Sequence, residues 1–391
     1  MVSINWQQQA EEANLSIRNF INGSPCPISP EAASPQIIEK YSPRDGRLLY
    51  SFPQGSANDV DTAVACAREA FDDGRWRGKA LSERVAVLNK LADLIEVNKD
   101  RFALYESLDV GKTITKALNE DVAGTAETLR NAAATASRML APSGADLGYF
   151  AYQRRKPVGV VAGIAGWNFP LGLAASKMAP ALVMGNCLVL KPSEFTSLSA
   201  QHLAALALEA GVPPGVFNVV HGAGLTVGAA LAAHQDVNLV SFVGSSVTGK
   251  NIMAAAGQSN MKRVILECGG KSPYLVFDDC PDNLEFIAAD IVGMAFPNQG
   301  ALCVAGTRLL IQESIRDELL PLIIEKAAAI RAGDPLNPDT TFGALVNEAH
   351  MNKVLAYIES GKEEGANLVL GGKPVVPAGN KQLQGGFYIE P

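Results

Sequence analysis

The fold is decided by an uncharged stretch, Pro157-Val158-Gly159-Val160-Val161-Ala162-Gly163-Ile164. Its β-branched residues favour a strand, and the lack of alternating polar residues indicates a strand covered on both faces. Similar apolar runs follow at 187–190, 216–220 and 239–243, and a helical pattern at 199–210 lies between two of them. Because such strands alternate with helices, the sequence predicts an α/β protein with a largely parallel, covered sheet.

Predicted strands and helices also lie on both sides of this region. From about residue 261 onward, the sequence predicts a strand at 274–277, a helix from about 283, a strand at 308–311 and a helix at 315–330. Upstream, the apolar residues of 82–95 recur every three or four positions, as in an amphipathic helix, with Ser82 as a candidate N-cap. A chain of 391 residues that is 48% hydrophobic can form a sizeable core and two or three structural units.

Charge and composition exclude several classes of function. The formal net charge is -7 and Lys and Arg are not clustered, which argues against a nucleic-acid partner. No apolar run reaches the length needed to cross a bilayer and the first residues lack a signal-peptide pattern, so we expect no membrane association and a cytoplasmic location. The six cysteines show no CxxC spacing and the four histidines are scattered, which favours neither a disulfide framework nor a metal site.

Cys303 is the candidate nucleophile. It lies in a Gly-containing, uncharged loop, Asn298-Gln299-Gly300-Ala301-Leu302-Cys303, where a thiol can take part in covalent chemistry. Glu267 ends an apolar run and is followed, after Cys268, by two glycines, so it is the candidate base. From these residues alone, a packing cysteine and a glutamate that merely ends a strand remain the alternatives.

Three turns are candidates for binding a dinucleotide. Residues 221–228 follow a strand and open a helix, but their third glycine comes one position later than in the usual fingerprint. Residues 242–249 place a Gly-Ser turn at a helix N-terminus, which favours a phosphate. Lys191-Pro192-Ser193-Glu194 could bind a ribose diol, and its carboxylate would repel a 2′-phosphate, which favours NAD over NADP. Each turn could equally be an ordinary connection between elements.

Taken together, five ordered motifs resemble the NAD(P)-dependent aldehyde dehydrogenase superfamily. They are Trp167-Asn168-Phe169-Pro170, Lys191-Pro192-Ser193-Glu194, Phe242-Val243-Gly244-Ser245, Leu266-Glu267-Cys268-Gly269-Gly270-Lys271 and 298–303, and the resemblance extends to 20–23, Asp109-Val110-Gly111-Lys112 and 155–160. Segments 259–264 and 303–310 look most like bacterial enzymes that oxidise ω-amino and γ-glutamylated aminoaldehydes in polyamine breakdown.

The resemblance implies an architecture. It consists of a Rossmann-like NAD-binding domain (1–136 and 157–260), a β-hairpin for oligomerisation (137–156) and an α/β catalytic domain (261–391). A homo-oligomer, either a dimer or a tetramer, is implied for the complete protein.

The resemblance also implies residue roles. Cys303 would attack the aldehyde to form a thiohemiacetal and then a thioester, Glu267 would act as the base, Asn168 would donate to the oxyanion and Lys177 would relay protons. The residues expected to bind NAD are Trp167, Lys191, Ser193, Glu194, Gly224, Gly244, Ser245, Gly249 and Glu267.

Two departures from the family pattern keep other functions open. Ser176 replaces a large aromatic residue of the aldehyde pocket, which leaves the substrate undecided. The chain ends at Pro391, before a family motif that holds the nicotinamide ribose, so we expect a part of a longer enzyme. The alternatives are a catalytically inactive NAD-binding or interaction protein and a CoA-acylating semialdehyde dehydrogenase, and Glu267 speaks against the latter.

Overall fold

The main sheet confirms the predicted α/β class. The computed structural model describes residues 4–29, 36–139, 143–144, 151–280 and 283–391. Within them the main sheet has seven strands, in the order β11-β10-β7-β8-β9-β1-β2. Their bounds are β11 (Arg263–Cys268), β10 (Leu239–Gly244), β7 (Val160–Ile164), β8 (Cys187–Lys191), β9 (Phe217–Val219), β1 (Asn19–Ile21) and β2 (Ser24–Cys26). The first five pair in parallel, and β1 pairs antiparallel with both β9 and β2.

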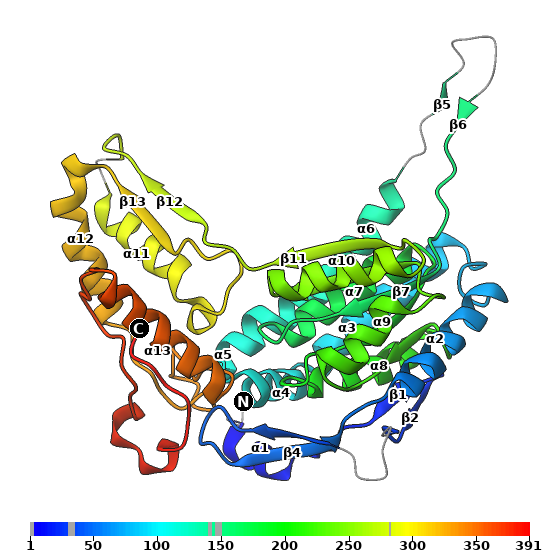
Figure 1. Ribbon diagram of the computed structural model, residues 1–391, viewed down its shortest axis with the longest axis horizontal. Coiled ribbons are helices and arrows are strands. Elements are labelled where there is room, and N and C mark those ends of the chain that lie inside the picture. Colours follow the sequence, from blue (N-terminus) through cyan, green and yellow to red (C-terminus); the bar gives the residue numbers. More distant parts are fainter. Residues whose placement is uncertain (1–3, 30–35, 140–142, 145–150, 281–282) are drawn as a thin grey trace.

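Helices cover both faces of this sheet (Figure 1). One face contacts α2 (Ala57–Asp72), which also packs on α9 (Ala229–Ala233), and α9 packs on α10 (Ser246–Gln258). The other face is covered by α7 (Pro170–Val183) and α8 (Leu198–Ala210), backed by α3 (Leu81–Val97), α4 (Lys99–Val110) and α6 (Ala123–Arg138). All five residues of β7 and of β8 are buried, which explains why the sequence shows uniformly apolar runs there.

A second group of elements forms around its own small core. Strands β12 (Pro273–Val276) and β13 (Arg308–Ile311) pair in parallel and pack against α11 (Leu284–Ala295) and α12 (Glu313–Ala328). Val276, Ile291 and Leu319 are buried between them. Helix α13 (Glu348–Glu363) lies beside this group in Figure 1. The domain boundaries expected from the sequence stay a prediction.

The remaining elements are short or peripheral. They are α1 (Trp6–Glu12), β3 (Ile37–Tyr41), β4 (Leu48–Pro53), α5 (Ile114–Lys116), β5 (Ser143–Gly144) and β6 (Ala151–Tyr152). Short π-helical segments span Ala117–Val122 and Gly224–Gly228, and short 3-10 segments span Pro297–Gly300, Pro377–Gly379 and Lys381–Leu383. Strands β5 and β6 pair antiparallel within the expected hairpin and project from the body in Figure 1, while residues 145–150 lie outside the described part of the chain. No helix of the described residues is both long enough and apolar enough to cross a membrane.

Two details of the prediction were wrong. Ser82 is not an N-cap, because α3 begins at Leu81 and the Ala80 N–H donates to the Glu83 carboxylate at 2.7 Å. Strand β11 was not predicted as a strand, although Glu267 lies in it. Its apolar run, Val264 to Leu266, has only three residues and is shorter than the runs that revealed its neighbours.

Candidate active site

The carboxyl ends of the parallel strands bring the predicted site residues to one edge of the sheet. Trp167 and Asn168 follow β7, Glu194 follows β8, Ser245 follows β10, and Glu267 stands near the end of β11. The chain runs outward from β7 in both directions, to β8 and β9 on one side and to β10 and β11 on the other. Ligands of open α/β sheets bind at such a switch point, so this edge is the candidate site.

The turn after β8 is held by an ion pair between buried Lys191 and half-buried Glu194. Lys191 is 2% exposed, and its Nζ donates to Glu194 Oε2 at 3.0 Å and to Pro192 O at 2.9 Å. The Gly224 N–H donates to Glu194 Oε1 at 3.4 Å, which joins a second predicted loop to this one. Burial by itself would raise the pKa of the Glu194 carboxyl, but Lys191 and the backbone N–H groups outweigh it and lower that pKa. Glu194 is therefore a carboxylate at neutral pH.

The turn after β10 presents a helix N-terminus. Ser245 is the N-cap of α10, and its Oγ accepts the Thr248 N–H at 3.1 Å. Ser245 is exposed, so the first turn of this 13-residue helix can approach an anion. A Cβ at Gly244 would lie 2.4 Å from Phe242 Cζ, so a larger residue there would require the Phe242 ring to move.

Two predicted cofactor residues are surrounded by protein atoms. Gly249 is buried where α10 packs on β11, and a Cβ there would lie 3.4 Å from Cys268 Sγ. Ser193 is also buried, and its Oγ accepts the Phe195 N–H at 3.3 Å, which shapes the turn. Contact of either residue with a cofactor stays a prediction.

The nucleophile loop has an unusual backbone. Cys303 is exposed, between a short 3-10 segment (Pro297–Gly300) and β13. Asn298 and Gln299 have positive φ angles of 50° and 57°, and Gly300 follows with 74°. Left-handed conformations are unfavourable for residues other than glycine, so tertiary contacts must hold this loop.

Hydrogen bonds join this loop to the loop after β7. Asn168 Nδ2 donates to Ala301 O at 2.9 Å, and Asn298 Nδ2 donates to Asn168 O at 2.9 Å. The Asn168 amide is therefore fixed two residues from Cys303. An amide nitrogen carries two hydrogens, so one remains available to an oxyanion. The sequence had singled out Asn298 only as part of a motif, not for this reciprocal contact.

Glu267 lies on β11 and Lys177 lies on α7. Glu267 is exposed, and the turn that follows it approaches the nucleophile loop, since a Cβ at Gly270 would lie 3.6 Å from Cys303 O. Lys177, on α7, is 5% exposed and donates to Ser241 Oγ at 3.2 Å. Burial lowers the pKa of Lys177 to about 8, and the Glu267 carboxylate opposes that shift.

No sequence pattern pointed to His350. Its ring, on α13, packs edge-on against Trp167 with centroids 4.8 Å apart. No motif surrounds it, and its partner lies far away along the chain. In the described residues, no group of three or more His, Cys, Asp or Glu side chains is arranged to hold a metal ion.

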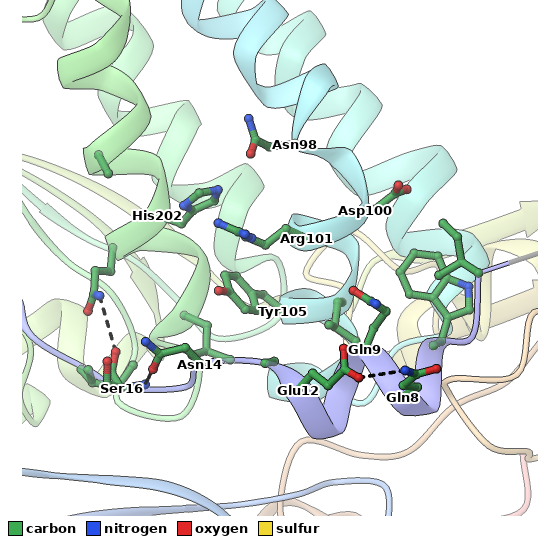
Figure 2. A pocket seen from close by; sticks show the side chains of 18 of the residues that line it. Gln8, Gln9, Glu12, Asn14, Ser16, Asn98, Asp100, Arg101, Tyr105 and His202 are labelled. Carbon is green, nitrogen blue, oxygen red and sulfur yellow. Dashed lines mark hydrogen bonds between the residues drawn. The ribbon is translucent and has the colours of Figure 1, made fainter.

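A cavity of about 1150 Å³ lies elsewhere, between α1, α4 and α8 (Figure 2). Arg101, Tyr105 and His202 point into it opposite Gln8 and Glu12. None of the predicted site residues lines it. Its lining includes both acidic and basic side chains, such as Glu12 and Arg101. Volume alone therefore does not make it the active site.

Comparison with known proteins identifies the family and the fold. A family model described as the aldehyde dehydrogenase family matches residues 30–391. The NADP/NAD-dependent aldehyde dehydrogenase PuuC of Escherichia coli (strain K12) is 43% identical over 367 residues, which are 94% of this chain and 73% of PuuC.

Two solved structures have the same fold. AldA of P. syringae, an indole-3-acetaldehyde dehydrogenase in complex with NAD+ and IAA, is 44% identical with a TM-score of 0.94. The γ-glutamyl-γ-aminobutyraldehyde dehydrogenase of Burkholderia cenocepacia is 42% identical with a TM-score of 0.93. Each match covers 99% of this chain and 76% of the other. The predicted fold class and family resemblance are thus confirmed.

Proposed function

Because the chain belongs to the aldehyde dehydrogenase family, we propose that it oxidises an aldehyde to a carboxylic acid with NAD+ through covalent intermediates on Cys303. The observation that carries this proposal is the bond from Asn168 Nδ2 to Ala301 O, which fixes an amide donor beside the nucleophile loop. The turn after Glu267 approaches the same loop. These contacts support roles for Cys303 as nucleophile, Glu267 as base and Asn168 as oxyanion donor.

The first step is attack on the aldehyde. The Cys303 sulfur bonds to the carbonyl carbon as a thiolate, and the thiol proton passes to Glu267. The carbonyl oxygen takes up negative charge and accepts hydrogen bonds from Asn168 Nδ2 and the Cys303 N–H. The product is a thiohemiacetal, which becomes a thioester when its carbon loses hydride.

The cofactor would be held at the sheet edge. Lys191 and Glu194 fit a ribose diol, the N-terminus of α10 at Ser245 fits a pyrophosphate, and Trp167 adds an apolar wall. When bound, NAD+ supplies the hydride acceptor. Because Glu194 is charged at neutral pH, it would repel a 2′-phosphate and favour NAD+ over NADP+. PuuC carries both cofactors in its name, so the preference needs measurement.

The thioester is then cleaved by water. Once the thiol proton has left Glu267 for solvent, Glu267 can take a proton from the attacking water as the Cys303 thiolate leaves, and Lys177, with its lowered pKa, can pass that proton onward. In this mechanism water releases the acid, so added CoA should not change the product. Formation of an acyl-CoA would instead favour the CoA-acylating alternative.

For the substrate we propose an aminoaldehyde of the kind released in polyamine breakdown. Support comes from the Burkholderia cenocepacia neighbour, whose name includes γ-glutamyl-γ-aminobutyraldehyde. AldA is equally similar and is named for indole-3-acetaldehyde, so the two classes must be compared directly. Ser176 is exposed on α7 and leaves more room than an aromatic side chain would.

The test is NADH formation at 340 nm by this chain and by its Cys303→Ala variant. We expect Cys303-dependent turnover with γ-aminobutyraldehyde and its γ-glutamyl form, and a lower kcat/KM with indole-3-acetaldehyde. The reverse order would overturn the substrate class. Folded protein that binds NAD+ but forms no Cys303 adduct with any of these aldehydes would favour the inactive alternative.

Assembly into a homo-oligomer through the β5–β6 hairpin is part of the same proposal. The projection of this hairpin in Figure 1 is the supporting observation. Light scattering tests it: a monomer at micromolar concentration would contradict it.

A further inference from the structure

The motif Asp109-Val110-Gly111-Lys112 has no role in the chemistry proposed above. It spans the end of α4, where Gly111 takes a left-handed conformation with φ 86°. Lys112 is only 2% exposed, although it carries an ammonium group. Burying a charge is costly unless it is paired, so the partners of Lys112 indicate what this motif does.

Lys112 lies beneath the loop that carries Asn168. Its Nζ is 2.9 Å from Asp121 Oδ2 and 4.3 Å from the centroid of the Phe169 ring. A cation over an aromatic face is attracted by the ring, and more strongly when water is excluded. The ammonium therefore holds the side chain of the residue that directly follows Asn168.

Glu106, on α4, supports α7, the helix that follows the Asn168 loop. Its carboxylate is fully buried, and Oε1 accepts the Leu171 N–H at 3.0 Å and the Ser199 hydroxyl at 2.7 Å. Leu171 is in the first turn of α7, which has no side-chain cap of its own. An acceptor supplied by α4 thus fixes the beginning of α7. Lys112 Nζ lies 3.7 Å from the other oxygen, Oε2.

Gly111 connects the motif to the nucleophile loop. Its carbonyl accepts the Ala344 N–H at 2.8 Å. A Cβ at Gly343 would lie 2.1 Å from Gly111 O and 3.2 Å from Gln299 Nε2. Gln299 is one of the left-handed residues before Cys303. The motif therefore contacts the oxyanion loop directly and backs the nucleophile loop through Gly343.

From these contacts we propose that Lys112 and Glu106 are positioning residues, which hold the Asn168 amide where the oxyanion forms. The inference rests on the proposed function of Asn168 and Cys303. Lys112 acts through the Phe169 ring, and Glu106 acts through the first turn of α7. Neither touches the substrate, so their effect must pass through Asn168.

A double-mutant cycle tests this dependence. Lys112→Met, Asn168→Ala and the combined variant are compared by NADH formation with the aldehyde that the wild-type chain uses best. We expect Lys112→Met to lower kcat about 10- to 100-fold, since a misplacement of about 1 Å can cost 100-fold, with KM for NAD+ changed less than about 2-fold. In the Asn168→Ala background the same change should cost less than about 3-fold. Additive effects would overturn the proposal.

Matched variants separate positioning from general stability. Lys262 is another buried lysine, whose Nζ donates to Ala232 O at 2.7 Å and to Ser259 Oγ at 2.6 Å, with no contact to the oxyanion loop. Lys262→Met should leave kcat within about 2-fold of wild type. An equal loss in Lys262→Met would contradict a specific role for Lys112. If Lys112→Met does not fold, Phe169→Leu removes the contacted ring without touching the buried charge, and the same non-additivity is expected.

Glu106 is tested by a conservative rescue. Glu106→Gln keeps an oxygen for the Leu171 N–H, whereas Glu106→Leu does not. We expect Glu106→Gln to retain most of the kcat that Glu106→Leu loses. Equal losses of kcat in the two variants would show that the oxygen that accepts the Leu171 N–H does not position Asn168.

Deuterium exchange gives a readout that needs no turnover. Lys112→Met and Glu106→Leu should speed exchange across residues 167–173, and Lys262→Met should not. Unchanged exchange would overturn the positioning role even in an inactive protein. By contrast, a wild-type chain without Cys303-dependent NADH formation would refute the proposed function. The exchange rates of residues 167–173 would still test whether Lys112 and Glu106 hold the loop.

Discussion

Replacing Lys177 with methionine should make the protein more stable at neutral pH. Burial lowers the pKa of Lys177 from 10.5 to about 8, a difference of about 2.5 units. Each unit corresponds to about 1.4 kcal/mol, so the buried ammonium costs about 3 kcal/mol of folding stability. Methionine is of similar length and carries no charge. The lost hydrogen bond to Ser241 Oγ offsets about 1 kcal/mol of the gain, which leaves about 2 kcal/mol.

The sign of the pH dependence follows from the same shift. Below pH 8 Lys177 is protonated in both the folded and the unfolded chain, so the full cost is present. Between pH 8 and 10.5 the folded chain releases the proton first, and the cost fades as the pH rises. The advantage of Lys177→Met should therefore be largest at pH 7 and should shrink towards pH 10.

Urea unfolding of both proteins at pH 7 and pH 9.5 measures this difference, since only the change between variants is compared. Lys250→Met, at an exposed position on α10, is the control and should shift stability by less than about 0.5 kcal/mol at either pH. A Lys177→Met variant that is less stable than wild type at pH 7, or whose advantage does not fall with pH, would refute the reasoning. The same variant should lose turnover if Lys177 relays protons.

Three further predictions concern the site and its supports. Asn168→Ala should lower kcat about 10²- to 10³-fold in the NADH assay, as expected for an oxyanion donor, and an unchanged kcat would remove that role. Glu194→Gln should raise kcat/KM for NADP+ relative to NAD+ about tenfold by removing a repulsive charge, and an unaltered ratio would contradict the cofactor preference. Gly343→Ala should lower stability by about 1–3 kcal/mol in urea unfolding, because its Cβ would overlap Gly111 O; wild-type stability would mean that the two segments can separate.

The sequence predicted the parts of the fold that depend on local pattern. Strand β8 is buried along its whole length, and the apolar run that this burial requires predicted the strand. The contact of Asn168 with Ala301 joins residues 133 positions apart, and no local pattern encodes it. Glu106 and Lys112 are charged residues of kinds that usually face solvent, so nothing in their spacing predicts a buried pair. The order of the family motifs predicted the site residues. Only the structure shows the contacts that hold these residues in place.

Buried lysines around the sheet edge suggest how the site divides its tasks. Lys191 and Lys112 each have a carboxylate oxygen within 3.0 Å, so their ammonium groups are compensated and serve as fixed charges. Lys177 has only a hydroxyl within hydrogen-bond distance, and the carboxylate that favours its charge, Glu267, is exposed. A poorly compensated ammonium releases its proton more easily, and proton transfer is most efficient when the pKa is near the working pH. Incomplete pairing of the Lys177 ammonium thus lowers the stability of the fold. The same incomplete pairing would allow Lys177 to transfer protons.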